Sequence, residues 1–395
     1  MLVKSVKIRR VSYACPAASG NRRSTCQTCL PRQCTCRSTG RYEVGITDII
    51  SGRTMPGQCV SENGTTCFHW VIEHLAQNEI REYVVNPKVT WDNTLQGVTV
   101  KDTPDNRVDI AIVNRLFTAY HYSSELARPY CYPVNDPYRS CVTRANVGEK
   151  PGETTDHEHH RSLWTSYGEV NGTNNWDELE GHGRTVHRSF DLLESGSVLG
   201  RLRAHSDWET AEGEVLLHET REFRVYDNRD DLAQIFDVIL ELEAASGDVH
   251  FGDTKEGGFL SVRVASTMDA SGDGQIENGY GGIGEFECWG KRSCWCDYSG
   301  PVDGRCSGIA VMEHPDTFRS PTYWHVRDYG LMSTNPFGAG TFQNDPNISG
   351  AYTLPQGERL HFAYRIMVHL GDAWDANVAK AYHGYINPPK VEVID

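Results

Sequence analysis

The stretch VTVKDTPDNRVDIAIVNRLFTAYHY (residues 98–122) decides the fold class. Its apolar residues alternate or run together over strand lengths at 98–100, 108–113 and 117–122, and Asp, Pro and Asn residues separate these runs. Such a pattern predicts successive β-strands joined by tight turns.

Comparable runs continue along the chain, at 186–190, 198–204, 213–226, 235–243, 249–251, 259–264, 308–312 and 360–370. Strand after strand without alternating helices is typical of a large antiparallel sandwich rather than an α/β fold. The 37 glycines, 17 prolines and 10% aromatic residues also fit a turn-rich β protein. We therefore expect residues 98–395 to form a mainly β domain, a large antiparallel β-sandwich.

The beginning of the chain has a different character. Residues 1–60 are basic and rich in cysteine, and we expect an irregular, poorly packed extension there. The pairs Cys26-x-x-Cys29 and Cys34-x-Cys36 could supply four thiolates to zinc, but they lie closer together than in structural zinc sites. Within a linker at 61–97, the segment CFHWVIEHLAQNEIREYV (67–84) predicts one amphipathic helix.

The charge of the chain limits the kinds of partner it can have. The net charge is −15, and the first 41 residues contain Lys and Arg but no Asp or Glu, so the remainder is still more acidic. An acidic body would repel phosphates, which argues against nucleic acid. No apolar run reaches the ~20 residues of a membrane-spanning helix, and no secretory signal is visible. The compartment and the oligomeric state stay open.

The segment DHEHHRSLW (156–164) is rich in ionisable side chains, with three imidazoles, two carboxylates and a guanidinium. We expect a strand or loop, because turn residues flank the run. In a strand, His157 and His159 would share one face and His160 the other. The pair His157 and His159 could hold a divalent metal ion, although no cofactor is required. A solvated polar loop is the alternative.

Two further segments combine ionisable and aromatic residues. In WHVRDYG (324–330), a strand would send Trp324, Val326 and Asp328 one way and His325, Arg327 and Tyr329 the other, as a sugar-facing row or as structural polar pairs. In EFECWGK (285–291), two carboxylates, an indole and an amine suit carbohydrate binding. The segment 269–280 resembles a calcium loop but has Tyr280 at position 12, and a glycine-rich hairpin is favoured.

Several motifs carry a resemblance to a known family, in the order RPYCYPV (128–134), DHEHHRSLW (156–164), GEVNG (168–172), GDTKEGGF (252–259) and PTYWHVRDYGLMSTNPFG (321–338). The chain resembles a bacterial family that carries the name methane oxygenase PmoA, a domain of unknown function. The resemblance covers roughly residues 98–390. It implies a supersandwich similar to that of the galactose mutarotase superfamily, which binds and transforms carbohydrates on a concave sheet face.

Three function classes remain open: a hydrolase, lyase or epimerase acting on a sugar or glycoside by His and carboxylate acid–base chemistry, a non-catalytic carbohydrate-binding module, and a metal-dependent oxidoreductase. The first is favoured, with a carbohydrate as partner. The candidate catalytic residues are His157, His159, His160, Arg161, His325 and Arg327. The candidate substrate-binding residues are Trp164, Glu285, Trp289, Lys291, Asp328, Tyr329 and Asn335. We expect the segments around 157–161 and 325–329 to meet in one site, with Glu285 and Lys291 at its rim.

Overall fold

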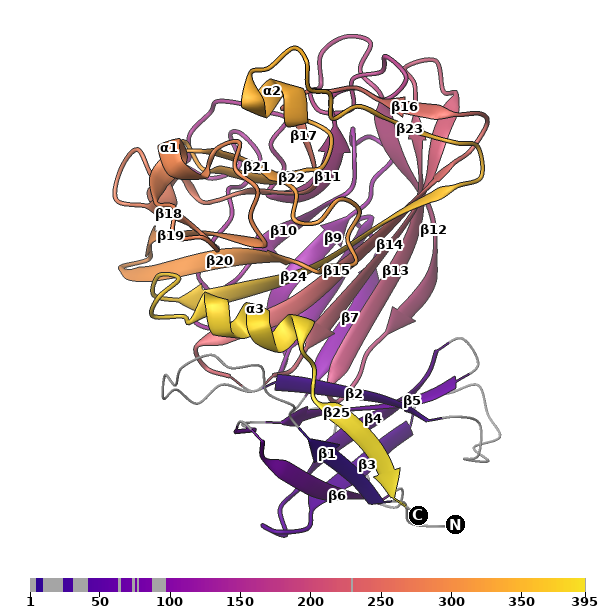
Figure 1. Cartoon of the computed structure of the whole chain (residues 1–395), viewed down its shortest axis with the longest axis vertical. Helices are drawn as coiled ribbons and strands as arrows, with labels where there is room; N and C mark the ends of the chain where they lie inside the picture. Colours follow the sequence, from indigo (N-terminus) through magenta and orange to yellow (C-terminus); the bar gives the residue numbers. More distant parts are fainter. Residues whose placement is uncertain are drawn as a thin grey trace.

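The computed structural model consists almost entirely of antiparallel β-structure (Figure 1). It describes residues 5–9, 24–30, 42–62, 65–72, 75–76, 78–86, 97–228 and 230–394. Two eight-stranded sheets form a sandwich, and a seven-stranded sheet lies at one end of it. The expected fold class, a large antiparallel β-sandwich, is confirmed.

The first sandwich sheet contains the strands that come from the predicted chemical segments. Its order is β21 (Tyr323–Arg327), β22 (Leu331–Asn335), β17 (Gly257–Arg263), β11 (Leu163–Tyr167), β10 (Tyr130–Val134), β9 (Arg115–His121), β8 (Arg107–Ile112) and β7 (Val98–Thr103). The three runs in residues 98–122 are thus β7, β8 and β9, paired through short turns as expected.

The second sandwich sheet is built largely of long strands. Its order is β12 (Arg184–Glu194), β13 (Leu199–Glu209), β14 (Val215–Tyr226), β15 (Ala233–Ala244), β24 (Arg359–Leu370), β20 (Arg305–Glu313), β19 (Trp295–Val302) and β18 (Gln275–Asn278). A separate pair joins β16 (Val249–Phe251) to β23 (Tyr352–Leu354).

Aromatic side chains join the two sandwich sheets across one core. Phe117 on β9 packs edge-on against Phe236 on β15, with ring centroids 5.3 Å apart. Phe259 on β17 stacks on Phe362 on β24 at 4.5 Å. Burial of such rings removes a large apolar area from water, which stabilises the face-to-face packing.

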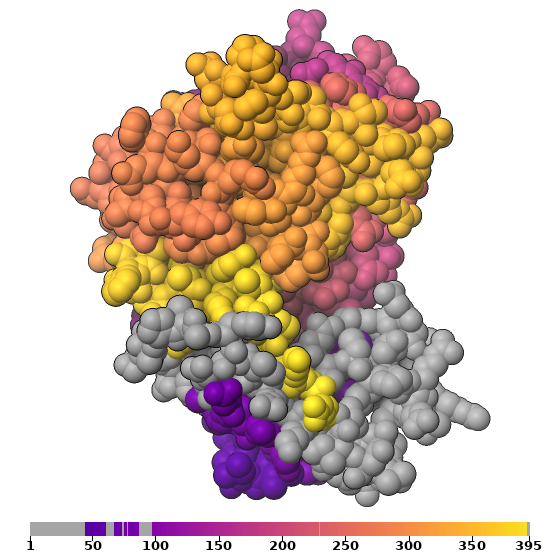
Figure 2. Space-filling model, in the orientation of Figure 1, coloured from indigo at the N-terminus to yellow at the C-terminus, as the bar shows by residue number. Residues whose placement is uncertain are grey.

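Short helices cover parts of the sandwich: α1 (Gly284–Cys288), α2 (Ala339–Gln343) and α3 (Val378–Ile386). Val378, Tyr382 and Tyr385 of α3 pack on the outer face of the second sheet. In Figure 2 this yellow segment lies below the orange segment that contains β18 to β20. None of the helices in the described ranges has the length and apolar character that a membrane crossing requires.

The predicted helix over 67–84 is wrong. The segment instead forms β5 (Thr65–Ile72) and β6 (Ile80–Asn86). Phe68, Trp70 and Ile72 alternate along β5 and enter a core, while His69 and Val71 between them are buried as well. A short apolar run that is buried on both faces cannot be distinguished from a helix by periodicity alone.

The expectation of a poorly packed extension is also wrong for residues 44–60. The N-terminal sheet has the order β2 (Ser24–Leu30), β5, β4 (Thr54–Glu62), β3 (Tyr42–Asp48), β6, β1 (Ser5–Arg9) and β25 (Lys390–Ile394). Val44, Ile46 and Cys59 lie in its core. The pairing of β1 with β25 joins segments from the two ends of the sequence. The side chains of Cys26, Cys29, Cys34 and Cys36, proposed for zinc, lie outside the described residues.

Removal of residues 1–60 is expected to leave the sandwich folded, because its core draws only on residues from Val98 onward. Among the described residues, the truncation removes the buried hydrogen bonds of Gln58 to β13 and the residue before it. Gln58 donates to the Leu199 carbonyl at 2.9 Å and accepts from the Leu199 amide at 2.9 Å and the Val198 amide at 3.2 Å. Water can replace these bonds once the sheet is absent. Thermal unfolding followed by near-UV circular dichroism should retain a cooperative transition, and its disappearance in the truncated protein would contradict the prediction.

Candidate functional site

The site is built around a loop that precedes β11. Arg144, which is fully buried, donates to the Asp156 carbonyl at 2.8 Å and to the His157 carbonyl at 2.9 Å. The His160 amide donates to the His157 carbonyl at 3.0 Å, and His157 has a φ of 45°. These contacts curl the backbone into a turn, a conformation in which side-chain direction does not alternate.

The three imidazoles therefore gather on one side. His157 stacks on His160 with centroids 4.8 Å apart, and His159 meets His160 edge-on at 4.6 Å. The expected separation of His157 and His159 from His160 is wrong, because it assumed a strand. Arg128 also donates to the His159 carbonyl at 3.1 Å, so a second buried guanidinium helps to shape the loop.

Asp156 and His157 form a hydrogen-bonded pair. Asp156 Oδ2 lies 2.5 Å from His157 Nδ1, and Arg263 donates to both carboxylate oxygens at 2.9 and 3.0 Å. Although burial alone would raise the pKa of Asp156, the His157 hydrogen bond and the Arg263 guanidinium hold it well below its usual range. The ionised carboxylate requires the proton of His157 on Nδ1, which leaves Nε2 as an acceptor. With 39% of its side chain exposed, His157 can reach a ligand.

His160 has the opposite proton arrangement. It is 1% exposed, and Arg263, which can only donate, lies with Nη1 3.1 Å from His160 Nδ1. Burial, followed by the neighbouring His159 and Arg263, lowers the pKa of His160 well below its usual value. His160 is thus a neutral ring whose proton sits on Nε2, and this buried N–H has no hydrogen-bond partner among the described residues.

His159 and His325 complete a group around Trp176. The Trp176 ring lies 5.9 Å from His159, 5.4 Å from His160 and 6.3 Å from His325. Burial lowers the pKa of His159 to about 4 and that of His325 to about 3. Within the described part of the chain, His159 Nε2 and both nitrogens of His325 are buried without a hydrogen-bond partner of normal geometry. The backbone of Lys255 lies beside the His325 ring but does not satisfy it.

The segment 324–330, which includes part of β21, also lies at the histidine group. Trp324 and Val326 are buried in the sandwich core, while His325, Arg327 and the following Tyr329 lie on the other side, as the strand alternation predicted. Tyr329 stacks on His157 with centroids 4.6 Å apart, and the guanidinium carbons of Arg263 and Arg327 lie 5.1 and 5.2 Å from its centroid. The structure therefore brings the two segments together.

Glu285 and Asp328 lie at the rim of this group. Glu285 Oε1 is 3.0 Å from Arg327 Nε, and its Oε2 accepts from the Asp328 amide at 2.7 Å. The Asp328 and Lys291 side chains are exposed. Trp289 packs edge-on against Phe342 at 5.3 Å, and its indole N–H is buried without a partner among the described residues.

Three predicted residues have structural roles instead. Trp164 is fully buried beneath His160 and donates to Ser166 Oγ at 2.8 Å, so its indole supports the His160 ring. Asn335 is fully buried, and its amide group bonds the Thr254 and Lys255 carbonyls and the Phe337 and Gly338 amides. Arg161 is paired with both oxygens of Glu178, which fixes the loop and leaves its guanidinium little freedom.

The site also contains residues that were not predicted for it from the sequence: Arg144, Arg263, Trp176 and Asp269. Asp269 Oδ1 is buried near Arg263 without a partner among the described residues, and burial raises the pKa of Asp269 to about 6. Arg144 lies 12 residues from Asp156 and Arg263 lies 107 residues from it, and no local pattern links an arginine to a carboxylate over such separations. Only Trp176, beside the turn-rich segment after 171, and Asp269, at the start of the calcium-like loop, had any sequence signal.

His157 and His159, which were considered as ligands of a divalent metal ion, have no third ligand beside them among the described residues. Across the described ranges, no three His, Cys, Asp or Glu side chains are arranged to hold a metal ion. His157 has Nδ1 committed to Asp156, and the rings of His157 and His159 meet edge-on at 5.8 Å. These residues therefore fit hydrogen bonding better than metal coordination.

Comparison with known proteins gives one family. Residues 107–383 match the model of a family described as a family of unknown function, DUF6807. The chain belongs to this family. The matched range contains both sandwich sheets apart from β7, as well as the histidine group. A search of functionally curated proteins gives no match.

Solved structures with a distant likeness come from Enterococcus faecalis. One is a protein of glycosyl hydrolase family 38, with 7% identity and a TM-score of 0.42, and the other is an alpha-mannosidase from strain V583, with 8% identity and a TM-score of 0.42. Each alignment covers 100% of this chain but only 47% and 46% of the respective relative, so the chain spans less than half their length.

Proposed function

We propose that this chain binds a carbohydrate at the histidine group and acts on it by acid–base chemistry through His157. The observation that carries the proposal is the set of buried ring nitrogens on His159, His160 and His325 that have no hydrogen-bond partner among the described residues. A buried polar group without a partner costs about 1–3 kcal/mol, and several such groups in one place favour a ligand that satisfies them.

The protonation of these rings selects the kind of ligand. Since the pKa values of all three are lowered, the rings are neutral near pH 7, and each neutral ring offers one donor and one acceptor. A hydroxyl group also donates and accepts, and therefore complements a neutral imidazole in either tautomer. A polyhydroxylated ligand such as a sugar matches this surface better than an anion, which only accepts.

His157 is the group best suited to move a proton. Asp156 contacts Nδ1 and orients the ring, which leaves Nε2 free to take a proton from the bound sugar. The same imidazolium then returns the proton to another oxygen or to a leaving group. Arg327, whose guanidinium carbon lies 5.2 Å from the centroid of the Tyr329 ring, supplies positive charge for an oxygen that becomes negative.

The test combines binding and turnover. The protein is screened by NMR against free sugars and glycosides, and His157→Gln and His325→Leu variants are compared on any substrate found. His157→Gln should reduce turnover by about 10²–10⁴-fold and leave binding nearly unchanged, because only the proton-transfer group is lost. His325→Leu should weaken binding instead.

Other outcomes are equally informative. A sugar that binds without any conversion, and as well to the His157→Gln variant, would mean that the chain is a carbohydrate-binding module. Binding and turnover that are unaffected by both substitutions would place the ligand elsewhere and refute the proposal. His361→Gln, on the exposed face of the second sheet, serves as the control variant and should change neither quantity.

A further inference from the structure

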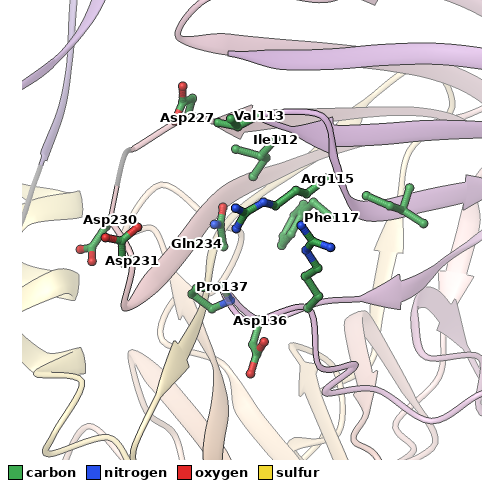
Figure 3. A pocket seen from close by; sticks show the side chains of 12 residues that line it. Ile112, Val113, Arg115, Phe117, Asp136, Pro137, Asp227, Asp230, Asp231 and Gln234 are labelled. Atoms are coloured by element: carbon green, nitrogen blue, oxygen red, sulfur yellow. The ribbon is translucent and has the colours of Figure 1, made fainter. Parts of the chain in front are cut away.

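A second place for a small ligand lies apart from the histidine group. It is an open pocket of about 180 Å³. Three segments line it: the tip of the β8–β9 hairpin at 112–117, the turn after β10 at 136–139, and the described parts of the connection from β14 to β15 at 227–228 and 230–234 (Figure 3). No residue of the histidine group belongs to these segments, so the inference does not depend on the proposed function.

Two arginines of this pocket have unused guanidinium groups. Among arginines whose side chains the structure describes, Arg115 and Arg139 differ from the others, since neither makes an ion pair, hydrogen bond or ring contact with a described residue through its guanidinium. Both line the same pocket. Paired guanidinium groups are well suited to a carboxylate, which they bind in a bidentate manner.

The pocket also offers acceptors that need donors. Asp230 and Asp231 lie together, on the opposite side of the pocket from Phe117 in Figure 3. Asp230 uses one oxygen for the Leu232 amide at 2.9 Å, and no contact of the Asp231 carboxylate with another described residue is seen. Gln234 Oε1 is buried and has no hydrogen-bond partner among the described residues. The other lining carboxylates, Asp136 and Asp227, are already bound by backbone amides.

The backbone at the pocket is strained. The two-residue hairpin turn between Ile112 and Arg115 has φ values of 50° at Val113 and 58° at Asn114. A type I′ turn normally has Asn or Gly at these positions, and a β-branched residue with positive φ is an outlier. Strain of this kind is often retained at ligand-binding sites. Val113 here adds an apolar side chain to the pocket wall beside Ile112 and Phe117.

We propose that this pocket binds a free α-amino acid with an apolar side chain. Arg115 and Arg139 bind its carboxylate, Asp231 and Gln234 accept from its ammonium group, and its side chain packs against Phe117 and the neighbouring apolar wall. A zwitterion balances the unused positive and negative charges of the lining, which a simple anion or cation does not.

Isothermal titration calorimetry with L-leucine and L-phenylalanine tests this assignment on the full chain. Two analogues of leucine isolate the two charges: 4-methylpentanoate lacks the ammonium group and 3-methylbutylamine lacks the carboxylate. Each analogue should bind about tenfold or more weakly than L-leucine, since it loses the charged hydrogen bonds at one end. Arg115→Met and Asp231→Asn should each weaken L-leucine binding by about the same factor.

The variants replace exposed side chains, so unchanged thermal unfolding without ligand is the check that they fold. Arg359→Met, at an ion pair on the other sheet, is the matched control and should bind L-leucine like the parent chain. Absence of binding by both amino acids at about 10 mM would overturn the proposal. Equal binding of 4-methylpentanoate, or unaltered binding by both pocket variants, would overturn it as well.

Discussion

Substitution of Arg263 by methionine is expected to lower the free energy of unfolding by about 1–3 kcal/mol, the range for leaving a buried polar group without its hydrogen-bond partner. Arg263 is fully buried and donates to both oxygens of Asp156 and toward His160 Nδ1. Methionine keeps much of the side-chain volume, but His160 Nδ1 loses its donor, while Asp156 keeps its contacts with Arg144 and His157. Urea denaturation at pH 7 measures this change, provided that the slope of the free energy of unfolding against urea concentration is the same in the variant and the parent chain.

Arg359→Met provides the comparison for this experiment. Arg359 is also paired with a carboxylate, Glu243, but its side chain is 63% exposed. Water competes for both groups there, and the expected loss is below about 1 kcal/mol. Equal losses in the two variants would mean that the Arg263 network does not stabilise the loop of the histidine group.

Burial of His325 and His159 is expected to make the folded protein less stable as the pH falls from 7 to 4.5. The folded state lowers the pKa of His325 to about 3 and that of His159 to about 4 through burial, whereas both rings titrate near 6.5 in the unfolded chain. Below pH 6.5 the unfolded state therefore binds more protons, so the stability present at higher pH is lost as the pH falls. His325 is 1% exposed, and its contribution to the free energy of unfolding should fall by about 2–3 kcal/mol over the two pH units below about 6.5.

Asp269 opposes part of this effect. Burial raises its pKa to about 6, so the folded state takes up a proton at Asp269 before the unfolded state does. Its contribution therefore favours the folded protein between pH 6 and about 4.

The pH dependence of unfolding in a His325→Leu variant isolates the histidine contribution. The slope of the free energy of unfolding against pH gives the number of protons taken up on unfolding. Between pH 6.5 and 4.5 this number should be smaller by close to one in the variant, because the variant has no imidazole at position 325 to protonate on unfolding. His250→Gln, at an exposed position, is the control. A slope identical to that of the parent chain in the His325→Leu variant would contradict the assignment of His325 as a buried neutral ring.

Much of the sandwich follows from local sequence. The runs at 98–100, 108–113, 213–226, 235–243 and 360–370 alternate or cluster apolar residues between turn residues, and each became a strand within a few positions of the expected one. The prediction of a helix over 67–84 was wrong because β5 is buried on both faces and its residues do not alternate between apolar and polar. Pairing of β5 with β2 and β4 makes this segment a strand.

The sequence by itself determined which residues could carry chemistry: the imidazoles of 157–160, and the alternation that sends His325, Arg327 and Tyr329 away from the core. Only the tertiary structure decided how they are used. Arg144 and Arg263 fold the loop so that three imidazoles share one side, and Asp156 contacts Nδ1 of His157. These contacts depend on buried charged and polar groups that meet only in the folded chain, as Arg263 and His160 do across 103 residues. No local pattern along a chain contains that information.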